Sequence, residues 1–435
     1  MNQTSNALLD FISKTPTGFH AVKNVSESLV SKGYTELNEA SDWKLEYGGK
    51  YFTTRNLSSL IAFRIPIEKP KSFMITAAHG DSPAFKIKEH AESEAAGFYT
   101  RINTEKYGGM IYSSWLDRPL SAAGKITVLG NGTITSKIVD LKRDLFLIPS
   151  VAIHMNRHAN ENASYNPAID MQPISGSISA KGGYKKLLAE VCECSEEDIL
   201  ASDMFLYSRD AGKTWGINEE FISSPRLDDL QCVFAAYSGF ISAKESSACP
   251  VLCIYDNEEV GSTTKQGAAS TFLKDTLTRI TDALGGNHSD YLKSLASSFM
   301  VSADNAHAVH PNHPEYSDPS HRPIINGGIV IKHNANQRYT TDALSSAVFT
   351  EICRKAGVPV QRFTNRSDIA GGSTLGNISN TQAAVNTVDI GLPQLSMHSS
   401  YETAGALDTD YLITALTFFF GSEIISEASD SIRIQ

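Results

Sequence analysis

Apolar strands alternate with helices through the second half of the chain, and this alternation constrains the fold more than any other feature. Strands are predicted at residues 251–255, 299–302, 328–332, 358–363 and 386–390, with helices at 226–244, 264–283, 341–355 and 408–420. Residues 72–78 form a similar apolar strand near the start. Long apolar β-branched strands separated by helices are typical of a mostly parallel sheet that is covered on both faces. We therefore expect an α/β fold.

The alternation is interrupted from about residue 86 to residue 224. Residues 125–129 and 133–139 are predicted to form a hairpin around Gly130-Asn131-Gly132, a strong turn signal. Helices are predicted only later, at 184–192 and 196–201. The 435 residues are enough for two or three domains. We expect one α/β domain, residues 1–85 and 225–435, interrupted by a β-rich insertion, residues 86–224.

Composition narrows the function classes. The chain has 38 Lys and Arg against 48 Asp and Glu, a net charge of −10, which argues against nucleic-acid and membrane-surface partners. The most apolar run, residues 412–420, is too short to span a bilayer, and residues 1–12 lack the features of a secretory signal. Six irregularly spaced cysteines favour reduced, mostly buried thiols. A cytoplasmic protein is expected.

Candidate functional residues follow the predicted strands, where parallel α/β sheets bind their ligands. His79 ends the strand 72–78 and has Asp81 two residues on, as a metal ligand with an orienting acid would. Glu258 and Glu259 follow the strand 251–255, so one could bind metal while the other serves as general base. Each could also be structural when taken alone.

Three further segments add to this set. Asp228, in Arg226-Leu227-Asp228-Asp229, begins a helix, Asp304 follows the strand 299–302, and His398 follows the strand 386–390. The nearby histidines lie in a Pro-broken loop, and we expect at most one of them near the site: His307, His310, His313 and His321. Two imidazoles and several carboxylates at strand ends match the ligands of a paired zinc, cobalt or manganese site.

The ordered motifs resemble the aspartyl aminopeptidase family of dinuclear zinc metallopeptidases almost end to end. They are Thr17-Gly18-Phe19-His20, His79-Gly80-Asp81-Ser82-Pro83, Arg226-Leu227-Asp228-Asp229, Asp256-Asn257-Glu258-Glu259-Val260-Gly261-Ser262, Asp304-Asn305-Ala306-His307-Ala308, Lys332-His333-Asn334-Ala335-Asn336-Gln337-Arg338-Tyr339 and Met397-His398-Ser399. The resemblance implies an exopeptidase-type α/β domain with an inserted β-rich domain that forms dimers and then a tetrahedral dodecamer.

The same resemblance implies roles for individual residues. His79, Asp228 and Asp304 would hold one metal ion, and Asp228, Glu259 and His398 the other, with Asp228 bridging. Glu258 would be the general base, and Asp81 would orient His79. His154, in the insertion, would reach a neighbour's active site and donate a hydrogen bond to the substrate carbonyl or the oxyanion.

Family specificity implies peptides with an N-terminal Asp or Glu, which requires a cation beside the metal ions. Lys332 is the first candidate and Arg338 the second, while Asp368 lies in a loop, residues 364–374, that departs from the usual family pattern. Two other functions stay open: a dinuclear hydrolase of other amides, such as acylated amino acids, and a non-catalytic shell-forming or regulatory protein.

Overall fold

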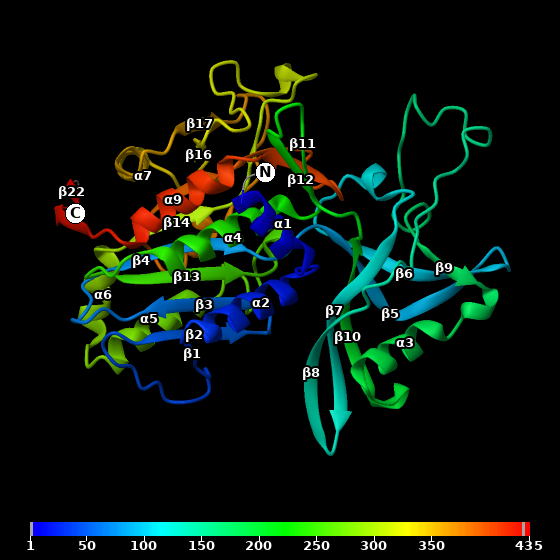
Figure 1. Ribbon diagram of the computed structural model, residues 1–435, viewed down its shortest axis with the longest axis horizontal. Coiled ribbons are helices and arrows are strands. Elements are labelled where there is room, and N and C mark those ends of the chain that lie inside the picture. Colours follow the sequence, from blue (N-terminus) through cyan, green and yellow to red (C-terminus); the bar gives the residue numbers. More distant parts are fainter. Residues whose placement is uncertain (1–2, 429–430) are drawn as a thin grey trace. The chain divides into compact units, whose positions relative to one another are not determined.

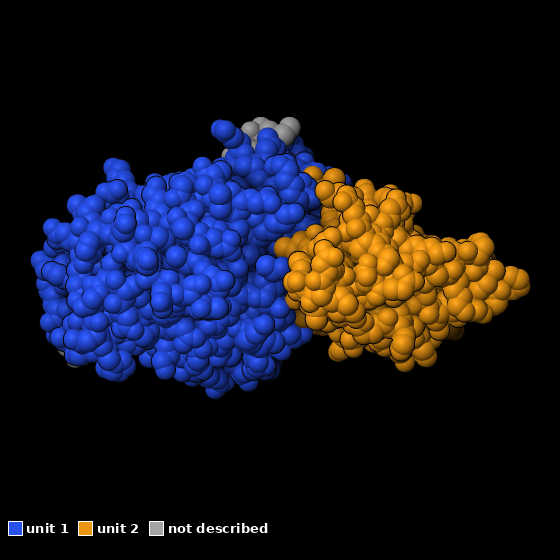
Figure 2. All heavy atoms as spheres, turned by 90° about the horizontal axis from the view of Figure 1, so that it is seen from below, with its two compact units in different colours: residues 1–81, 213–397, 402–435 blue, residues 82–212, 398–401 orange. Residues whose placement is uncertain are grey.

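The chain forms two compact units in the computed structural model, which describes residues 3–428 and 431–435 (Figure 1). Unit 1 comprises Met1–Asp81, Lys213–Met397 and Glu402–Gln435, and unit 2 comprises Ser82–Gly212 and His398–Tyr401. Figure 2 colours them separately. The chain therefore leaves unit 1 after the first strands and returns to it for the remainder of the sheet.

A mostly parallel sheet forms the centre of unit 1, as the alternation of strands and helices predicts. Its order is β1-β2-β3-β13-β4-β14-β18-β16-β17. The strands are β1 (Thr35–Glu36), β2 (Lys50–Arg55), β3 (Ser59–Arg64), β4 (Phe73–His79), β13 (Cys249–Tyr255), β14 (Phe299–Ala303), β16 (Ile329–His333), β17 (Val360–Thr364) and β18 (Asn386–Gly391). Strand β4 runs parallel to both of its neighbours, β13 and β14. The carboxyl ends of these three strands therefore lie at the same edge.

Helices cover both faces of this sheet, which explains why its strands are apolar throughout (Figure 1). The helices of unit 1 are α1 (Gln3–Ser13), α2 (Gly18–Ser31), α4 (Leu227–Ser242), α5 (Phe272–Ala283), α6 (His288–Ala296), α7 (Ala343–Ala356), α8 (Leu375–Ser379) and α9 (Asp408–Phe420). Met74 and Ala78 of β4 pack in a core with α2, α4, α7 and α9, and Ile75 and Ala77 pack in a second core with α5, α6 and α8. Successive side chains of a strand thus serve opposite faces.

Two smaller sheets complete unit 1. One has the order β11-β12-β20-β19-β15, and the other is a C-terminal hairpin. Their strands are β11 (Lys213–Trp215), β12 (Phe221–Ser224), β15 (Ala306–His307), β19 (Pro393–Leu395), β20 (Glu402–Gly405), β21 (Ile424–Ala428) and β22 (Ser431–Ile434). Strand β15 follows β14 closely and β19 follows β18, so the small sheet continues from the carboxyl edge of the large one.

Unit 2 is built on an antiparallel sheet of order β8-β7-β10-β5-β6-β9, packed with the helix α3 (Gly183–Cys192). Its strands are β5 (Ala84–Ala95), β6 (Tyr99–Tyr107), β7 (Leu120–Gly130), β8 (Thr133–Asp140), β9 (Ile174–Ser177) and β10 (Ile199–Ser208). The predicted hairpin is confirmed: Gly130 pairs with Thr133, and Asn131 and Gly132 both have positive φ, as a two-residue turn of this kind requires.

Two predicted helices differ from the structure. Residues 196–201 form the short 3-10 helix η3 (Glu196–Asp198), after which β10 begins, because the residues from Ile199 on pair with β7. The helix predicted at residues 264–283 begins only at Phe272, since a series of turns precedes it. Among the described residues, no helix is both long and apolar enough to cross a membrane.

Candidate metal centre

The predicted metal ligands of unit 1 come from the carboxyl edge of its large sheet. His79 is the last residue of β4, Asp304 follows β14, and Asp228 lies in the first turn of α4. Glu258 and Glu259 follow β13 in the 3-10 helix η4 (Glu258–Val260). Because β13, β4 and β14 are parallel neighbours, their ends bring residues far apart in the sequence together.

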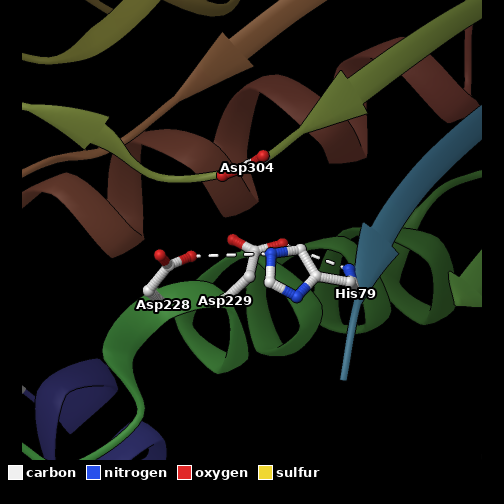
Figure 3. A group of neighbouring side chains, drawn as sticks. All are labelled: His79, Asp228, Asp229 and Asp304. Atoms are coloured by element: carbon white, nitrogen blue, oxygen red, sulfur yellow. Dashed lines mark hydrogen bonds and ion pairs between the residues drawn. The ribbon is translucent and has the colours of Figure 1, made fainter. Parts of the chain in front are cut away.

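Four buried side chains form the first group at this edge: His79, Asp228, Asp229 and Asp304 (Figure 3). Each offers one possible ligand atom, and these atoms lie within 4.8 Å of one another. His79 Nε2 is 3.6 Å from Asp228 Oδ1. The backbone N–H of His79 donates to Asp229 Oδ2 at 3.2 Å, which ties the end of β4 to the start of α4. One imidazole and three carboxylates therefore face one another.

A second group adds the two glutamates. His79, Glu258 and Glu259 also offer ligand atoms within 4.8 Å of one another. Asp81 holds this arrangement, because its Oδ1 and Oδ2 accept the backbone N–H groups of Glu258 and Glu259, each at 3.2 Å. His79 Nδ1 lies 3.1 Å from the backbone carbonyl oxygen of Asp81 and 3.5 Å from its Oδ1. Asp81 thus contacts the imidazole and both glutamates at once.

The turn that carries the glutamates is tight because its flanking residues adopt left-handed backbone angles. Asn257 has φ 61° and Gly261 has φ 95°, a conformation that Asn and Gly adopt more readily than other residues. Thr264 Oγ1 and Gln266 Nε2 each donate to Asn257 Oδ1 at 2.8 Å. The sequence after β13 therefore fixes the position of Glu258 and Glu259.

Without a bound cation, this centre brings together more acidic than basic side chains. Burial raises the pKa of Glu258 to about 8, with Asp304 and Asp81 adding to the effect and His79 opposing it. Burial also raises the pKa values of Glu259, Asp229 and Asp304, which neighbouring acids raise further. Burial lowers the pKa of His79, but its contacts with Asp228 and Asp81 raise it to a net increase. A divalent cation would compensate this negative charge, and the nitrogen and oxygen donors suit zinc.

Lys332 lies beside Asp304 at the same edge. Its Nζ donates to the backbone carbonyl of Asn305 at 2.9 Å and is 3.6 Å from Asp304 Oδ1. The side chain is buried, and its Nζ is 5.4 Å from the centroid of the Tyr339 ring. Burial alone lowers the pKa of Lys332, but Asp304 raises it to a net increase. Lys332 is therefore a buried cation that already pairs with a predicted metal ligand.

The remaining predicted residues are three that are exposed and His398 of unit 2. Arg338 is exposed, and Asp368 is exposed and paired with Arg366 at 2.6 Å. His154 is exposed in unit 2, and His398 belongs to the short segment of unit 2 in which its carbonyl accepts from the Ile111 N–H at 3.0 Å. Within the described ranges, none of the histidines of the Pro-broken loop joins a metal-type group: His307, His310, His313 and His321.

Sequence reasoning assigned no role to Asp229, Asn305, Gln394 or Glu402. Asp229 had a visible signal, since it is the second acid of a pair at a helix start. Glu402 and Gln394 had no such signal in the sequence. They lie in β20 and β19, and only the pairing of these strands brings them close to the centre. Glu402 Oε2 accepts the backbone N–H of Asp228 at 2.9 Å.

A buried set of imidazole and carboxylate groups at the carboxyl edge of a mostly parallel α/β sheet is typical of a metal-dependent hydrolase. Residues 11–420 match the family model described as Aminopeptidase I zinc metalloprotease (M18), and the chain belongs to this family. It is thus a metallopeptidase of the aminopeptidase type, and its fold is that of the family.

Individual relatives are similar to this protein over nearly the whole length of its chain. The probable M18 family aminopeptidase 2 of Clostridium acetobutylicum is 47% identical over 95% of this chain and 97% of the relative. A chain in the cryo-EM structure of the Ape4 and Nbr1 complex matches with a TM-score of 0.92 at 37% identity, covering 96% of this chain and 85% of that one. The S. cerevisiae mApe1 dodecamer matches with a TM-score of 0.85 at 28% identity, covering 96% of both chains.

Proposed function

We propose that this aminopeptidase removes the N-terminal residue of peptides with two divalent metal ions, zinc first and cobalt or manganese as alternatives. His79, Asp228 and Asp304 hold one ion, and Asp228, Glu259 and His398 hold the other, with Asp228 bridging. The observation that carries this proposal is the convergence of His79, Asp228 and Asp304 within 4.8 Å at one sheet edge. His398 is assigned from its Met397-His398-Ser399 motif.

The chemistry divides between the metal ions and the side chains. A divalent ion held by these residues would polarise the scissile carbonyl and would lower the pKa of the attacking water. Glu258 accepts the proton of that water and delivers it to the leaving amine, so it acts first as base and then as acid. Its place beside His79 and Glu259, in the turn whose backbone Asp81 holds, suits Glu258 to both tasks. Asp81 orients His79 and holds the backbone of Glu258.

For the substrate, we propose a preference for N-terminal Asp or Glu. Lys332 is the first candidate for the cation that attracts the acidic side chain, because it is a buried positive charge 3.6 Å from Asp304 Oδ1. Arg338 is the second candidate, and the loop that carries Asp368 contributes to the substrate pocket. Membership of an aminopeptidase family favours peptides over acylated amino acids.

For the assembly, we propose a cytoplasmic homo-oligomer in which residues 86–224 form the dimerisation domain and dimers build a tetrahedral dodecamer. A dodecameric relative supports this proposal. So do the exposed apolar side chains on either side of His154: Val151, Ile153 and Met155 are 60%, 48% and 84% exposed. In the assembly, His154 reaches a neighbour's active site and donates a hydrogen bond to the substrate carbonyl or the oxyanion.

One experiment tests the activity and its substrate class together. Peptides that differ only in an N-terminal Asp, Glu, Leu, Lys or Ala are assayed before metal removal, after chelation and after zinc is restored. Activity that disappears with the metal and returns with zinc, highest on Asp and Glu, supports the proposal. Full activity in metal-free protein contradicts the metal mechanism, and equal rates on all five peptides contradict the acidic preference.

A further inference from the structure

A buried chain of hydrogen bonds connects the backbone of Asp228 to the residue that follows Asp304. The N–H of Asp228 donates to Glu402 Oε2 at 2.9 Å. Gln394 Nε2 donates to Glu402 Oε1 at 3.5 Å, and Asn305 Nδ2 donates to Gln394 Oε1 at 2.8 Å. Three side chains from separate segments therefore connect two predicted ligands that the sequence separates by 76 residues (304 − 228).

These three side chains belong to unit 1 and are almost completely buried. Glu402, Gln394 and Asn305 are 2%, 1% and 2% exposed. Asn305 Nδ2 also contacts the Leu227 carbonyl oxygen at 3.0 Å and Gln231 Oε1 at 3.2 Å, so it touches the turn that leads into Asp228. Buried polar side chains in such a network are held in one arrangement, because an unsatisfied donor or acceptor there is costly.

We propose that Glu402, Gln394 and Asn305 are positioning residues that hold Asp228 and Asp304 at the separation a metal ion requires, and thereby raise the chain's affinity for metal. The inference rests on the ligand roles of Asp228 and Asp304 in the proposed function. Groups outside the ligand set act in this way when they fix the orientation of the ligands. Residues that touch no metal ion would then set how tightly the ion binds.

The donor and acceptor atoms of the network allow its hydrogen bonds to run in only one direction, from Asn305 through Gln394 to Glu402. Glu402 faces two donors, the Asp228 N–H and the Gln394 amide, and only a carboxylate offers an acceptor oxygen to each. Gln394 cannot turn its amide around, because its Oε1 must accept from Asn305 Nδ2. Asn305 is fixed in turn, because its Nδ2 faces acceptors alone, on Gln394, Leu227 and Gln231, while its Oδ1 accepts from the Cys232 thiol. A glutamine at position 402 would therefore leave two donors facing each other.

Because the hydrogen bonds have one direction, two variants can test the donor and acceptor pattern while the size of the side chains stays the same. Glu402→Gln keeps the size of the side chain and creates the donor clash. The double variant Glu402→Gln/Gln394→Glu moves the carboxylate one position along the chain of bonds. The new glutamine then accepts from Asp228 and donates to the new glutamate, which also accepts from Asn305. Every donor again has an acceptor, at unchanged total charge.

The test measures zinc affinity directly. Zinc is titrated into the metal-free full-length chain against a chromophoric chelator, and the unfolding midpoint of the metal-free chain is recorded alongside. Glu402→Gln is expected to lower zinc affinity about 10- to 100-fold, and the double variant to recover most of that loss. Glu351→Gln, on the surface of α7, is the matched control and retains wild-type affinity. Zinc affinity is the readout that a role in stability alone would leave unchanged.

The outcomes distinguish this inference from the function on which it rests. If His79→Ala leaves zinc binding unchanged, the proposed ligand set is wrong. If His79→Ala lowers zinc affinity but Glu402→Gln equals the Glu351→Gln control, the positioning role is overturned. If Glu402→Gln does not fold, the double variant decides. Folding with near-wild-type zinc affinity supports the inference, whereas failure to fold, or folding with weak zinc binding, overturns it.

Discussion

Unit 1 buries carboxylates in two contrasting ways. Asp408, at the start of α9, is fully buried and accepts the backbone N–H groups of Asn326 at 2.7 Å and Gly328 at 3.1 Å. The acids at the carboxyl edge of the large sheet instead face one another and the imidazole of His79. The first arrangement satisfies a carboxylate with the chain alone, while the second gathers charges that a cation would compensate.

This contrast teaches how a structural acid differs from a candidate metal ligand. Two backbone donors supply what a buried carboxyl group needs and hold a loop in place. Several acids within ligand distance raise one another's pKa values, and the chain tolerates this only where something cationic binds. The sign and size of the response to substitution should therefore differ between the two places.

The largest expected effect is on Glu258, which the proposal makes a proton carrier and not a metal ligand. Glu258→Gln should lower kcat about 10²- to 10⁴-fold, because the amide cannot accept the proton of the attacking water. Zinc content should remain that of the wild type. Peptide turnover and metal analysis on the same preparation measure the two effects.

Glu351→Gln is the control for this substitution, since Glu351 is paired with Arg354 on the surface of α7. Its kcat should equal that of the wild type. Substantial turnover by Glu258→Gln would show that another group moves the proton. Loss of zinc together with turnover would make Glu258 a ligand.

A smaller effect is expected on Asp81, which accepts two backbone N–H groups with its two carboxylate oxygens. Asp81→Asn leaves one of these donors facing an amide N–H. The turn that carries Glu258 and Glu259 should shift, and zinc affinity should fall about 10- to 100-fold. Chelator competition measures this change.

Asp318→Asn is the control, because Oδ1 of Asp318 alone accepts from Ser320 and His321, and asparagine retains that oxygen. Equal zinc affinity of the two variants would exclude an orienting role for Asp81.

Lys332 and Arg338 sharpen the contrast between a buried and an exposed cation. Lys332→Met should reduce the ratio of kcat/KM on N-terminal Glu over Leu peptides at least about tenfold, and Arg338→Met should reduce it less. Lys332→Met should also destabilise the chain, because Asp304 loses its neighbouring cation. A lower unfolding midpoint with an unchanged Glu-to-Leu ratio would mean that Lys332 serves Asp304 and not the substrate.

The parts of the fold that the sequence predicts are those that local rules determine. Apolar strands with intervening helices predicted the mostly parallel sheet, and Gly130-Asn131-Gly132 predicted the β7–β8 hairpin. His79 and Asp304 could be selected because they stand at strand ends, where parallel neighbours bring side chains together. Their gathering with Asp228 in one group follows from the same topology.

Long-range pairing accounts for what the sequence could not predict. Glu402 lies in a short strand whose pairing with β12 and β19 is not visible in local periodicity, so its contact with Asp228 could not be anticipated. The helix predicted at residues 196–201 was wrong beyond Asp198 because pairing with β7 extends residues 199–208 into a strand. Tertiary hydrogen bonding outweighs local propensity at such positions.

The last expected effect concerns Asp408, changes stability and not activity, and completes the comparison. Burial raises its pKa to about 7, although the N–H groups of Asn326 and Gly328 oppose the change. Between pH of about 4 and 7 the folded chain therefore retains a proton that the unfolded chain releases, and the stability contributed by Asp408 falls as pH rises, by at most about 1.4 kcal/mol per pH unit. Asp408→Asn removes this dependence.

In urea unfolding of metal-free protein, the midpoint of the wild type should exceed that of the variant by more at pH 5 than at pH 8. A difference that is the same at both pH values would mean that Asp408 is already ionised in the folded chain. The two backbone donors would then outweigh burial, and Asp408 would differ from the acids of the metal centre in charge as well as in partners.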